Sequence, residues 1–429
     1  LTMDQSPLPI KWKKIIERLA IEDTIIVNQD NGQYRTVNHP LFKNSKNLAW
    51  GHPSSAKWPV GQSIGFADKM AKEYKTVGRL IKAIIANAIK NVREAKVHQP
   101  LGPNSKLAKS HNTRFPIVQG PMTRVSDVPE FIESVADAGG LPFLALSMIS
   151  GKAVTELLKD TQNRLKDKPW GIGILGFVPE ELRIQQFKEI KKIKPPFALI
   201  SGGSVAQVKE FEKEGISTYM HAPVPSLLKI FLDQGCIRFV FEGRECGGHV
   251  GPIGSFTLWE SAINILLELP ESKAKEIHVL FAGGIHNDMS ASMVSAMSGQ
   301  LASKGIKVGV IMGTAYLFTS EVCNSGAVLS GFQKAAFECE KTAVIETSPG
   351  HAIRCADTPF IKEFEIEKEK GNDDLEKLIL GRLRIASKGI LRNDSGKLIN
   401  VSEKDQYDNG MFMLGEVASM MNSLTSMEQ

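Results

Sequence analysis

Short apolar runs alternate with longer amphipathic stretches from about residue 115 to residue 325. Eight runs rich in β-branched or aromatic residues have the length of buried strands; they lie at 115–119, 142–146, 170–175, 196–200, 217–221, 238–242, 277–282 and 308–312. The intervals between them predict helices at 128–138, 152–164, 179–191, 205–214, 225–233, 258–269, 289–302 and 314–325. Eight strands, each followed by a helix, indicate an α/β protein with a (β/α)8 TIM barrel. A doubly wound sheet is the competing architecture, but it rarely needs eight near-equal units.

The segments on either side of the barrel carry helical periodicity. Apolar residues recur at helical spacing through 65–96, which predicts one amphipathic helix with a solvated, lysine-rich face. Methionine and leucine recur in the same way through 410–421, where we expect a helix packed on the barrel mouth. We therefore predict three parts, which are a basic, mainly helical extension (1–113), the barrel (114–330) and a C-terminal helical lid (331–429).

The net charge of +5 is the sum of two unlike parts. Residues 1–113 carry 18 Lys and Arg against 8 Asp and Glu, a net of +10, and the remaining 316 residues carry 34 against 39, a net of −5. A solvated surface explains the basic part most simply, and a docking surface for an acidic partner is the second interpretation. Nucleic acid is not an expected partner, because the basic residues are not interleaved with aromatic ones.

Composition and cysteine usage narrow the class of protein. With 42% hydrophobic and 23% charged residues, the chain has the balance of a globular protein. The longest uncharged stretch, 289–303, has 15 residues, fewer than the roughly 18 that a membrane span needs, so we expect no membrane association. Five widely spaced cysteines without a Cys-x-x-Cys pair favour a reducing, cytoplasmic compartment and no metal site.

The loops that follow the strands are where a (β/α)8 barrel keeps its reactive groups. Gly283-Gly284 and Gly313-Thr314 follow the last two strands. Backbone N–H groups at such turns can bind phosphate, so two glycine turns together favour a phosphate-bearing ligand over simple tight turns. The segment 171–176 fits the pattern G-x-G-x-x-G, but its glycines lie within an apolar run. We interpret it as a barrel strand that passes beneath a bound ring.

His249 is the strongest candidate for proton transfer among the nine histidines. It lies on a glycine-rich loop after the sixth strand, and an imidazole exchanges protons near neutral pH. A histidine that only holds the loop is the alternative. Cys246 could pair with it as a nucleophile, but a small buried side chain is the favoured interpretation. His221 ends the fifth strand and is expected to face the same mouth.

Several strings resemble one family of flavoenzymes. The segments 119–122 (QGPM), 243–249 (GRECGGH), 282–285 (AGGI) and 312–314 (MGT) are similar to those of nitronate monooxygenases, or 2-nitropropane dioxygenase-like proteins. That family includes the flavin enoyl-acyl carrier protein reductases. Over about 115–420, longer strings resemble the version within polyketide and polyunsaturated-fatty-acid-type synthases; they are VQGPMTRVSD, PWGIGILGFVPEELR, FVFEGRECGGHVGP, GHAIRCADTPF and LGRLRIASKGI.

The resemblance implies an FMN-dependent oxidoreductase in which His249 matches the catalytic histidine. It implies flavin-ring contacts from Met122 and Thr123, and a phosphate site formed by Gly283, Gly284, Gly313 and Thr314. The other expected cofactor-site residues are Gly173, Ser201, Gly202, His221, Glu242, Gly247, Gly248, Ala282 and Met312. The segment 351–354 is expected to close over the flavin. Cys246 stands where the commoner motif has alanine, which should change packing only.

Two reactions and one non-catalytic role are compatible with these residues. The favoured hypothesis is reduction of an enoyl thioester on an acyl carrier protein by NADPH or NADH, with His249 helping to protonate the α-carbon. Nitronate oxidation by O2 is the alternative. A docking barrel without turnover is the third hypothesis, and the glycine turns and His249 argue against it. Other synthase domains are the expected partners, and a homodimer is one expected assembly state.

Overall fold

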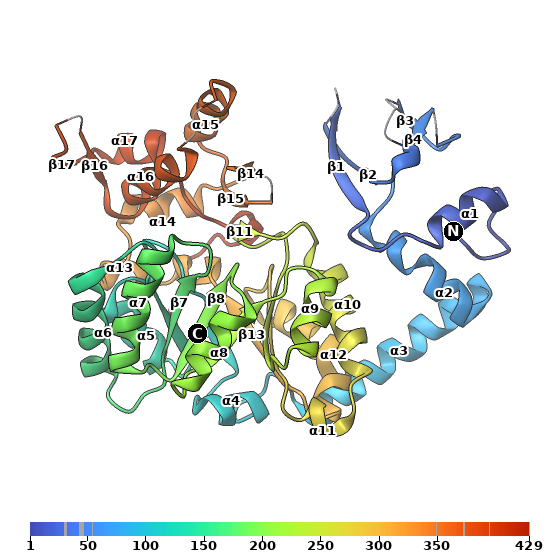
Figure 1. The fold of residues 1–429 in the computed structure, drawn as a ribbon, viewed down its shortest axis with the longest axis horizontal. Coiled ribbons are helices and arrows are strands. Elements are labelled where there is room, and N and C mark those ends of the chain that lie inside the picture. Colours follow the sequence, from blue (N-terminus) through green and yellow to red (C-terminus); the bar gives the residue numbers. More distant parts are fainter. Residues whose placement is uncertain are drawn as a thin grey trace.

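The centre of the protein is a closed barrel of eight parallel strands (Figure 1). The computed structural model describes residues 1–429 except 30–31, 43–46, 54, 349, 372–373, 394 and 429. The barrel strands are β5 (Ile117–Gln119), β6 (Leu141–Ala145), β7 (Gly171–Leu175), β8 (Phe197–Ser201), β9 (Ser217–His221), β10 (Arg238–Glu242), β12 (His278–Ala282) and β13 (Lys307–Met312). They pair in chain order, and β13 closes the barrel on β5. The predicted (β/α)8 barrel is confirmed.

Helices surround the barrel in the predicted alternation. They are α5 (Pro129–Asp137), α6 (Gly151–Leu165), α7 (Glu180–Ile193), α8 (Val205–Lys213), α9 (Pro225–Asp233), α10 (Ser255–Leu267), the short α11 (Glu271–Ala274) and α12 (Asp288–Ser303). The single helix expected at 314–325 is wrong. The chain forms a 3-10 helix, η3 (Thr314–Phe318), and then α13 (Ser320–Asn324). Thr319 separates them because it is extended and forms a bridge with Thr425.

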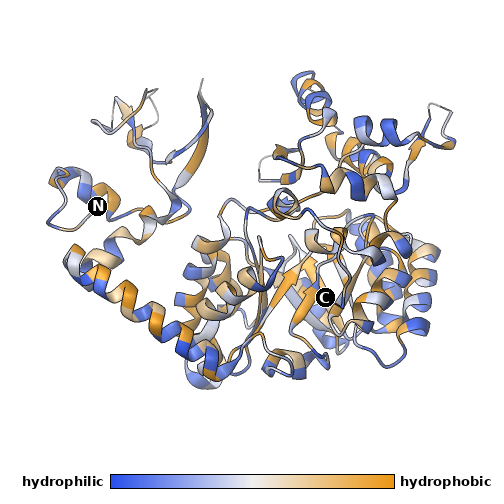
Figure 2. Ribbon diagram, turned by 180° about the vertical axis from the view of Figure 1, so that it is seen from behind, coloured by the Kyte–Doolittle hydropathy of each residue, from blue (hydrophilic) through white to orange (hydrophobic). Residues whose placement is uncertain are grey.

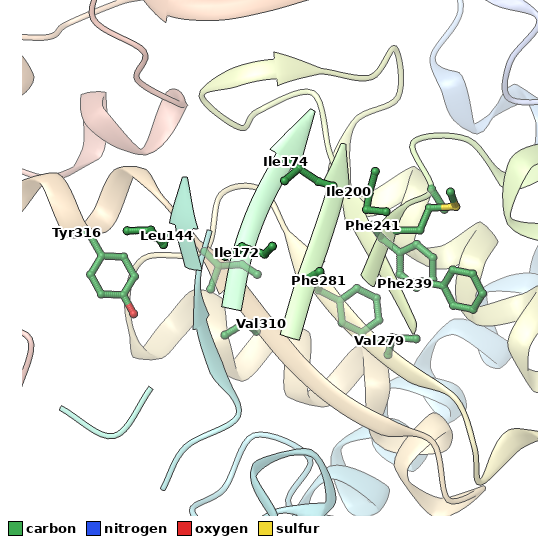
Figure 3. Close-up of a cluster of buried hydrophobic side chains, with 14 of the residues drawn as sticks. Leu144, Ile172, Ile174, Ile200, Phe239, Phe241, Val279, Phe281, Val310 and Tyr316 are labelled. Atoms are coloured by element: carbon green, nitrogen blue, oxygen red, sulfur yellow. The ribbon is translucent and has the colours of Figure 1, made fainter. Parts of the chain in front are cut away.

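Alternating side chains of the strands fill two separate cores. One core lies between the strands and the surrounding helices and includes Ile172 and Phe281 (Figure 3). The other fills the inside of the barrel and includes Phe143 and Leu199. All four side chains are buried. Because side chains fill the interior, the barrel leaves space for a ligand at its end and not along its axis.

A short helix, α4 (Lys106–His111), closes the opposite end of the barrel. Leu107 is fully buried in the interior core. The imidazole Nε2 of His111 lies 2.7 Å from the hydroxyl oxygen of Tyr219, and that of His278 lies 2.8 Å from the Ser110 hydroxyl oxygen. Residues 106–111, which the predicted division placed in the extension, therefore pack as part of the barrel.

This closed end should make the protein sensitive to acid. Burial lowers the pKa of both His111 and His278 from 6.5 to about 3. Between these values the unfolded chain binds protons that the folded chain does not, so the free energy of unfolding should fall as the pH falls from 6.5 towards 3. Urea midpoints at about pH 8 and about pH 5 would measure the fall. His278→Gln should show a smaller fall than the wild type, and an equal fall would contradict the assignment.

The N-terminal unit contains the expected helices and, in addition, two pairs of strands. Its elements are α1 (Ile10–Ile16), β1 (Thr24–Gln29), β2 (Gly32–Val37), η1 (Pro40–Phe42), β3 (Asn47–Leu48), β4 (Ala56–Lys57), η2 (Gln62–Phe66), α2 (Ala67–Tyr74) and α3 (Val77–His98). Phe42 and Trp58 belong to a small core of its own. The continuous helix expected at 65–96 is wrong. Lys75 has a left-handed backbone (φ +61°), and the Thr76 side chain caps a new helix by accepting a hydrogen bond from the Arg79 backbone N–H.

The C-terminal lid likewise combines helices with strands. Its elements are α14 (Ser330–Phe337), β14 (Thr342–Glu346), β15 (Ala352–Ala356), α15 (Pro359–Glu369), α16 (Leu375–Lys388), β16 (Ile390–Arg392), β17 (Leu398–Asn400), α17 (Glu403–Asn409) and η4 (Glu416–Met420). Strand β11 (Gly248–Val250), from the loop after β10, joins β15 and β14 in an antiparallel sheet. The helix expected at 410–421 is wrong, because only the short 3-10 helix η4 forms there. At Gly415 a Cβ would lie 2.7 Å from the Glu245 carbonyl oxygen, so the backbones approach too closely for a side chain.

The described part of the chain contains neither a membrane span nor a cluster of metal ligands. No helix in it is long and apolar enough to cross a bilayer. No three His, Cys, Asp or Glu side chains in it gather where they could hold a metal ion. All five cysteines are free thiols.

Candidate active site

A cavity lies at the end of the barrel where the strands finish and the loops begin. Its wall is built by residues after most of the barrel strands and by residues 413–417 of the lid. Fourteen predicted site residues line it; they are Met122, Thr123, Ser201, His221, Glu242, Gly247, Gly248, His249, Ala282, Gly283, Gly284, Met312, Gly313 and Thr314. The barrel thus brings together segments that are far apart in the sequence.

The two glycine turns lie next to each other because β12 and β13 are paired, with Ala282 opposite Ile311. Gly283 and Gly284 both have positive φ, +120° and +74°. A Cβ on Gly283 would collide with the Ser255 hydroxyl, whereas one on Gly284 would meet no atom within 4 Å. The turn therefore needs glycine for its backbone shape, and at Gly284 it leaves open space at the cavity wall.

His249 is held in the cavity wall by the lid sheet. It lies on β11 opposite Ile353 of β15, and its flanking residues Gly248 and Val250 pair with the same strand. Its ring centroid lies 5.6 Å from that of Phe177, in an edge-to-face arrangement. Because β11 belongs to a barrel loop and pairs with β15 of the lid, both the barrel and the lid hold His249 in position.

Several hydrogen bonds anchor the loop that carries His249. The Glu245 carboxylate accepts from the backbone N–H of Ser255 at 2.9 Å and from its hydroxyl at 2.7 Å. Arg354 of the lid, almost fully buried, donates from Nε to the Arg244 carbonyl at 2.9 Å. From the N-terminal unit, the Gln62 amide donates to the Pro252 carbonyl at 2.8 Å. The barrel, the lid and the N-terminal unit all hold this loop, which pre-organises the position of His249.

Three short polar contacts shape the rest of the wall. His221 Nδ1 lies 2.9 Å from a Glu242 carboxylate oxygen, because strands β9 and β10 are neighbours. The Ser147 hydroxyl donates to the Thr123 hydroxyl at 2.9 Å. The Met122 backbone N–H donates to the Ser126 hydroxyl at 2.8 Å. These contacts fix the first loop and place a carboxylate at the cavity wall.

Cys246 also lines the cavity, but its chemistry is that of a neutral thiol. Burial raises its pKa well above the usual value, and the carboxylates of Glu242 and Glu245 raise the pKa further. A nucleophilic cysteine needs the opposite shift, toward the thiolate. The geometry agrees with a packing role for Cys246.

Two predicted site residues, Gly173 and Gly202, do not line the cavity. At Gly173 the missing side chain makes room for Pro121, with which a Cβ would collide. At Gly202 a Cβ would lie 2.7 Å from the Phe177 ring. Both glycines therefore act one layer behind the wall, where they let a proline and an aromatic ring pack closely.

The lid contributes residues that the sequence pattern does not identify. Met413, Gly415 and Val417 line the cavity, and the Gly415 backbone N–H donates to the Thr314 hydroxyl at 2.9 Å. Gly410 and Gly415 are the sequence signal that could have identified this segment, because they interrupt the helical spacing of the methionines. The segment 351–354 does not reach the cavity wall. His351 instead packs on Phe177, with ring centroids 5.4 Å apart.

The chain is similar in sequence to one known protein and in fold to several solved structures. No protein-family model matches the chain. A protein of Rhodococcus jostii (strain RHA1), named (3aS,4S,5R,7aS)-5-hydroxy-7a-methyl-1-oxo-octahydro-1H-indene-4-carboxyl-CoA dehydrogenase, is 26% identical over 270 residues, which are 60% of this chain and 67% of that protein. FabK from Thermotoga maritima superposes with a TM-score of 0.61 at 21% identity, over 76% of this chain and 92% of its own.

Two further solved structures are similar in the same way. A nitroalkane oxidase from Streptomyces ansochromogenes has a TM-score of 0.57 at 17% identity, over 75% of this chain and 94% of its own. The enoyl reductase domain of MlnA, from the macrolactin biosynthesis cluster of Bacillus amyloliquefaciens, has a TM-score of 0.53 at 14% identity. The match covers 75% of this chain and 90% of that domain's chain. The chain shares the barrel fold of these proteins.

Proposed function

We propose that this chain is an FMN-dependent oxidoreductase, and specifically the NAD(P)H-dependent enoyl-thioester reductase domain of a polyketide- or fatty-acid-type synthase. The observation that carries the proposal is that His249 and both glycine turns line one cavity, at the end of the barrel where such enzymes keep their sites. The fold similarity to an enoyl reductase domain supports it.

The cavity wall fits FMN. Gly283, Gly284 and Gly313 would hold the phosphate through backbone N–H groups, and Gly284 leaves open space where any side chain would project. Met122 and Thr123, on the first loop, would lie against the ring system. When bound, the flavin supplies hydride transfer, a chemistry that no side chain performs.

The remaining wall provides the protein's own contribution to the reaction. His249 would deliver a proton to the α-carbon of the thioester, and its attachment to β15 holds the imidazole in place for this step. Met413 and Val417 of the lid would exclude water from the reacting groups. His221 and Glu242, in contact at 2.9 Å, would orient the bound cofactor or substrate through hydrogen bonds.

Names of the similar proteins support a thioester substrate. The Rhodococcus protein is a dehydrogenase of a carboxyl-CoA compound, which is a thioester, and the MlnA domain is an enoyl reductase. We further propose that an acyl carrier protein presents the substrate in the cytoplasm, beside other synthase domains. The nitroalkane oxidase supports the alternative, nitronate oxidation.

A paired assay should separate the two reactions. The FMN-loaded protein should oxidise NADPH or NADH in the absence of air when a crotonyl thioester on a carrier protein is supplied. It should not consume a nitronate in air at a comparable rate. Turnover of the nitronate alone would replace the proposal by its alternative. Failure to bind FMN at all would leave the docking barrel as the remaining hypothesis.

A further inference from the structure

Arg354 is a buried arginine of the lid that lies just behind the cavity wall. Its side chain is 8% exposed, and Figure 2 shows how strongly hydrophobic the barrel strands beneath the lid are. A charge in such surroundings needs several polar partners. Arg354 lies on β15 opposite Gly248 of β11, so it is next to the strand that carries His249. It does not itself line the cavity.

The guanidinium group of Arg354 connects three parts of the chain. Its Nε donates to the Arg244 carbonyl, on the loop that carries His249, at 2.9 Å. Its Nη1 donates to the Thr342 hydroxyl of β14 at 2.7 Å and pairs with the Glu416 carboxylate at 3.1 Å. A planar guanidinium presents its donors in fixed directions. The side chain therefore holds the loop and the lid in one relative position.

The backbone beside Glu416 completes a closed set of contacts around the cavity. The Glu416 N–H donates to the Glu245 carbonyl at 2.9 Å, one residue along from the carbonyl that Arg354 holds. Gly415, directly before it, lines the cavity and donates to the Thr314 hydroxyl at the second glycine turn. One ion pair thus joins the loop after β10, the lid wall and a turn where we place the phosphate.

The charges around Arg244 explain why this set of contacts contains a carboxylate. Burial lowers the pKa of Arg244, and the positive charge of Arg354 lowers it further. Three carboxylates raise it again; they are Glu346, Glu245 and Glu416. Of these, Glu416 pairs directly with Arg354. Its negative charge offsets the repulsion between two guanidinium groups that would otherwise push the loop and the lid apart.

We propose that Arg354, through its pair with Glu416, is a positioning residue that sets where the lid wall lies against the loop that carries His249. The inference rests on the proposed function, in which His249 transfers a proton. A misplacement of about 1 Å can reduce the rate of a reaction about 100-fold. Because Arg354 acts through the backbone of the loop and of the lid, its loss should lower kcat more than it raises KM.

Steady-state rates of the FMN-loaded protein with the crotonyl thioester give the first test. Arg354→Gln should reduce kcat at least about tenfold and change KM less than about threefold. The matched control is Arg382→Gln. Arg382 is also a mostly buried lid arginine, 18% exposed, which pairs with Glu363 and donates to the Asn409 carbonyl at 3.4 Å, but neither it nor its partners line the cavity.

The control separates positioning from stability. Arg382→Gln should lower the unfolding midpoint about as much as Arg354→Gln does, because each removes a lid ion pair and a hydrogen bond to a carbonyl, and it should leave kcat unchanged. A wild-type kcat in Arg354→Gln, or an equal loss of kcat in both variants, would overturn the proposal.

A double-mutant cycle tests whether the ion pair makes the connection. Glu416 is 49% exposed, so Glu416→Gln should not endanger folding. It should reduce kcat about threefold or more, and the double variant should be no slower than Arg354→Gln alone, because both changes remove one interaction. Fully additive losses would show that the two residues act separately, which contradicts the proposal.

Hydrogen exchange without cofactor or substrate distinguishes this inference from the proposed function. In Arg354→Gln the amides of Gly415 and Glu416 should exchange at least about tenfold faster than in the wild type, because their acceptors lie across the contact that Arg354 holds. Arg382→Gln should leave both amides unchanged. Unchanged exchange in Arg354→Gln would refute the inference whatever the reaction is. A wild type that turns over no thioester would contradict the proposed function, and the faster exchange would still support the role of Arg354 in placing the lid wall.

Discussion

Replacing His249 by alanine should reduce turnover about 10²–10⁴-fold while FMN stays bound, the range expected when a positioned proton-transfer group is lost. The physical reason is the placement of the imidazole. His249 lines the cavity on a strand that pairs with the lid, and the glycine turns where we propose the phosphate binds follow β12 and β13. The substitution should therefore remove the proton donor without disturbing the phosphate site.

The measurement is the steady-state rate with the crotonyl thioester, alongside the flavin absorbance at about 450 nm. His249→Gln serves as the comparison, because glutamine retains a polar side chain of similar reach but exchanges no proton near neutral pH. It should be as slow as the alanine variant. A glutamine variant with wild-type rate would show that the residue only holds the loop. Loss of the flavin colour in both variants would place His249 in cofactor binding instead.

Replacing Gly284 by alanine should weaken FMN binding at least about tenfold, or about 1.4 kcal/mol. Two effects combine at this position. Its φ of +74° is unfavourable for any residue with a Cβ, at a cost of about 1–2 kcal/mol. The added methyl group would also project into the open space at the cavity wall, where we place the phosphate.

Gly326 offers a closely matched control for the Gly284 prediction. Its φ is +73°, and a Cβ there would also meet no atom within 4 Å, but it lies outside the cavity wall. Gly326→Ala should lower the unfolding midpoint as much as Gly284→Ala does, and leave the FMN dissociation constant unchanged. Fluorescence titration with FMN and thermal unfolding of both variants would measure the two effects separately. Equal FMN affinity in both variants would show that Gly284 shapes the turn but does not contribute to FMN binding.

The barrel and most of the cavity wall were predictable from the sequence because their signals are local. Each strand is a short apolar run, and each site loop directly follows one, so the order of the chain alone places Met122, His249 and Gly284 at the same mouth. Gly173 shows the limit of this reasoning. A glycine within a strand signals a close approach, but only the folded chain shows that the neighbour is Pro121.

The errors at the two ends have a common physical cause. Helical spacing through 65–96 and 410–421 does not reveal a break at a single residue, such as the left-handed Lys75 or the crowded Gly415. Both breaks coincide with contacts to distant parts of the chain, because the Val77 backbone N–H donates to the Gln5 side-chain oxygen at 2.7 Å and Gly415 lies against the Glu245 carbonyl. Strand β15 illustrates this most clearly, because its partner β11 lies about a hundred residues earlier in the chain.

The sequence by itself determined the eightfold alternation, the glycine turns and the candidate proton donor, since periodicity and turn chemistry depend on neighbouring residues. The tertiary structure alone decided three other features. They are the pairing of the His249 strand with the lid, the closure of the barrel base by α4, and the solvent exposure of apolar side chains on α3. An amphipathic pattern states that a helix has an apolar side, but not which surface, if any, covers it. That depends on contacts between segments distant in the chain, which no local pattern encodes.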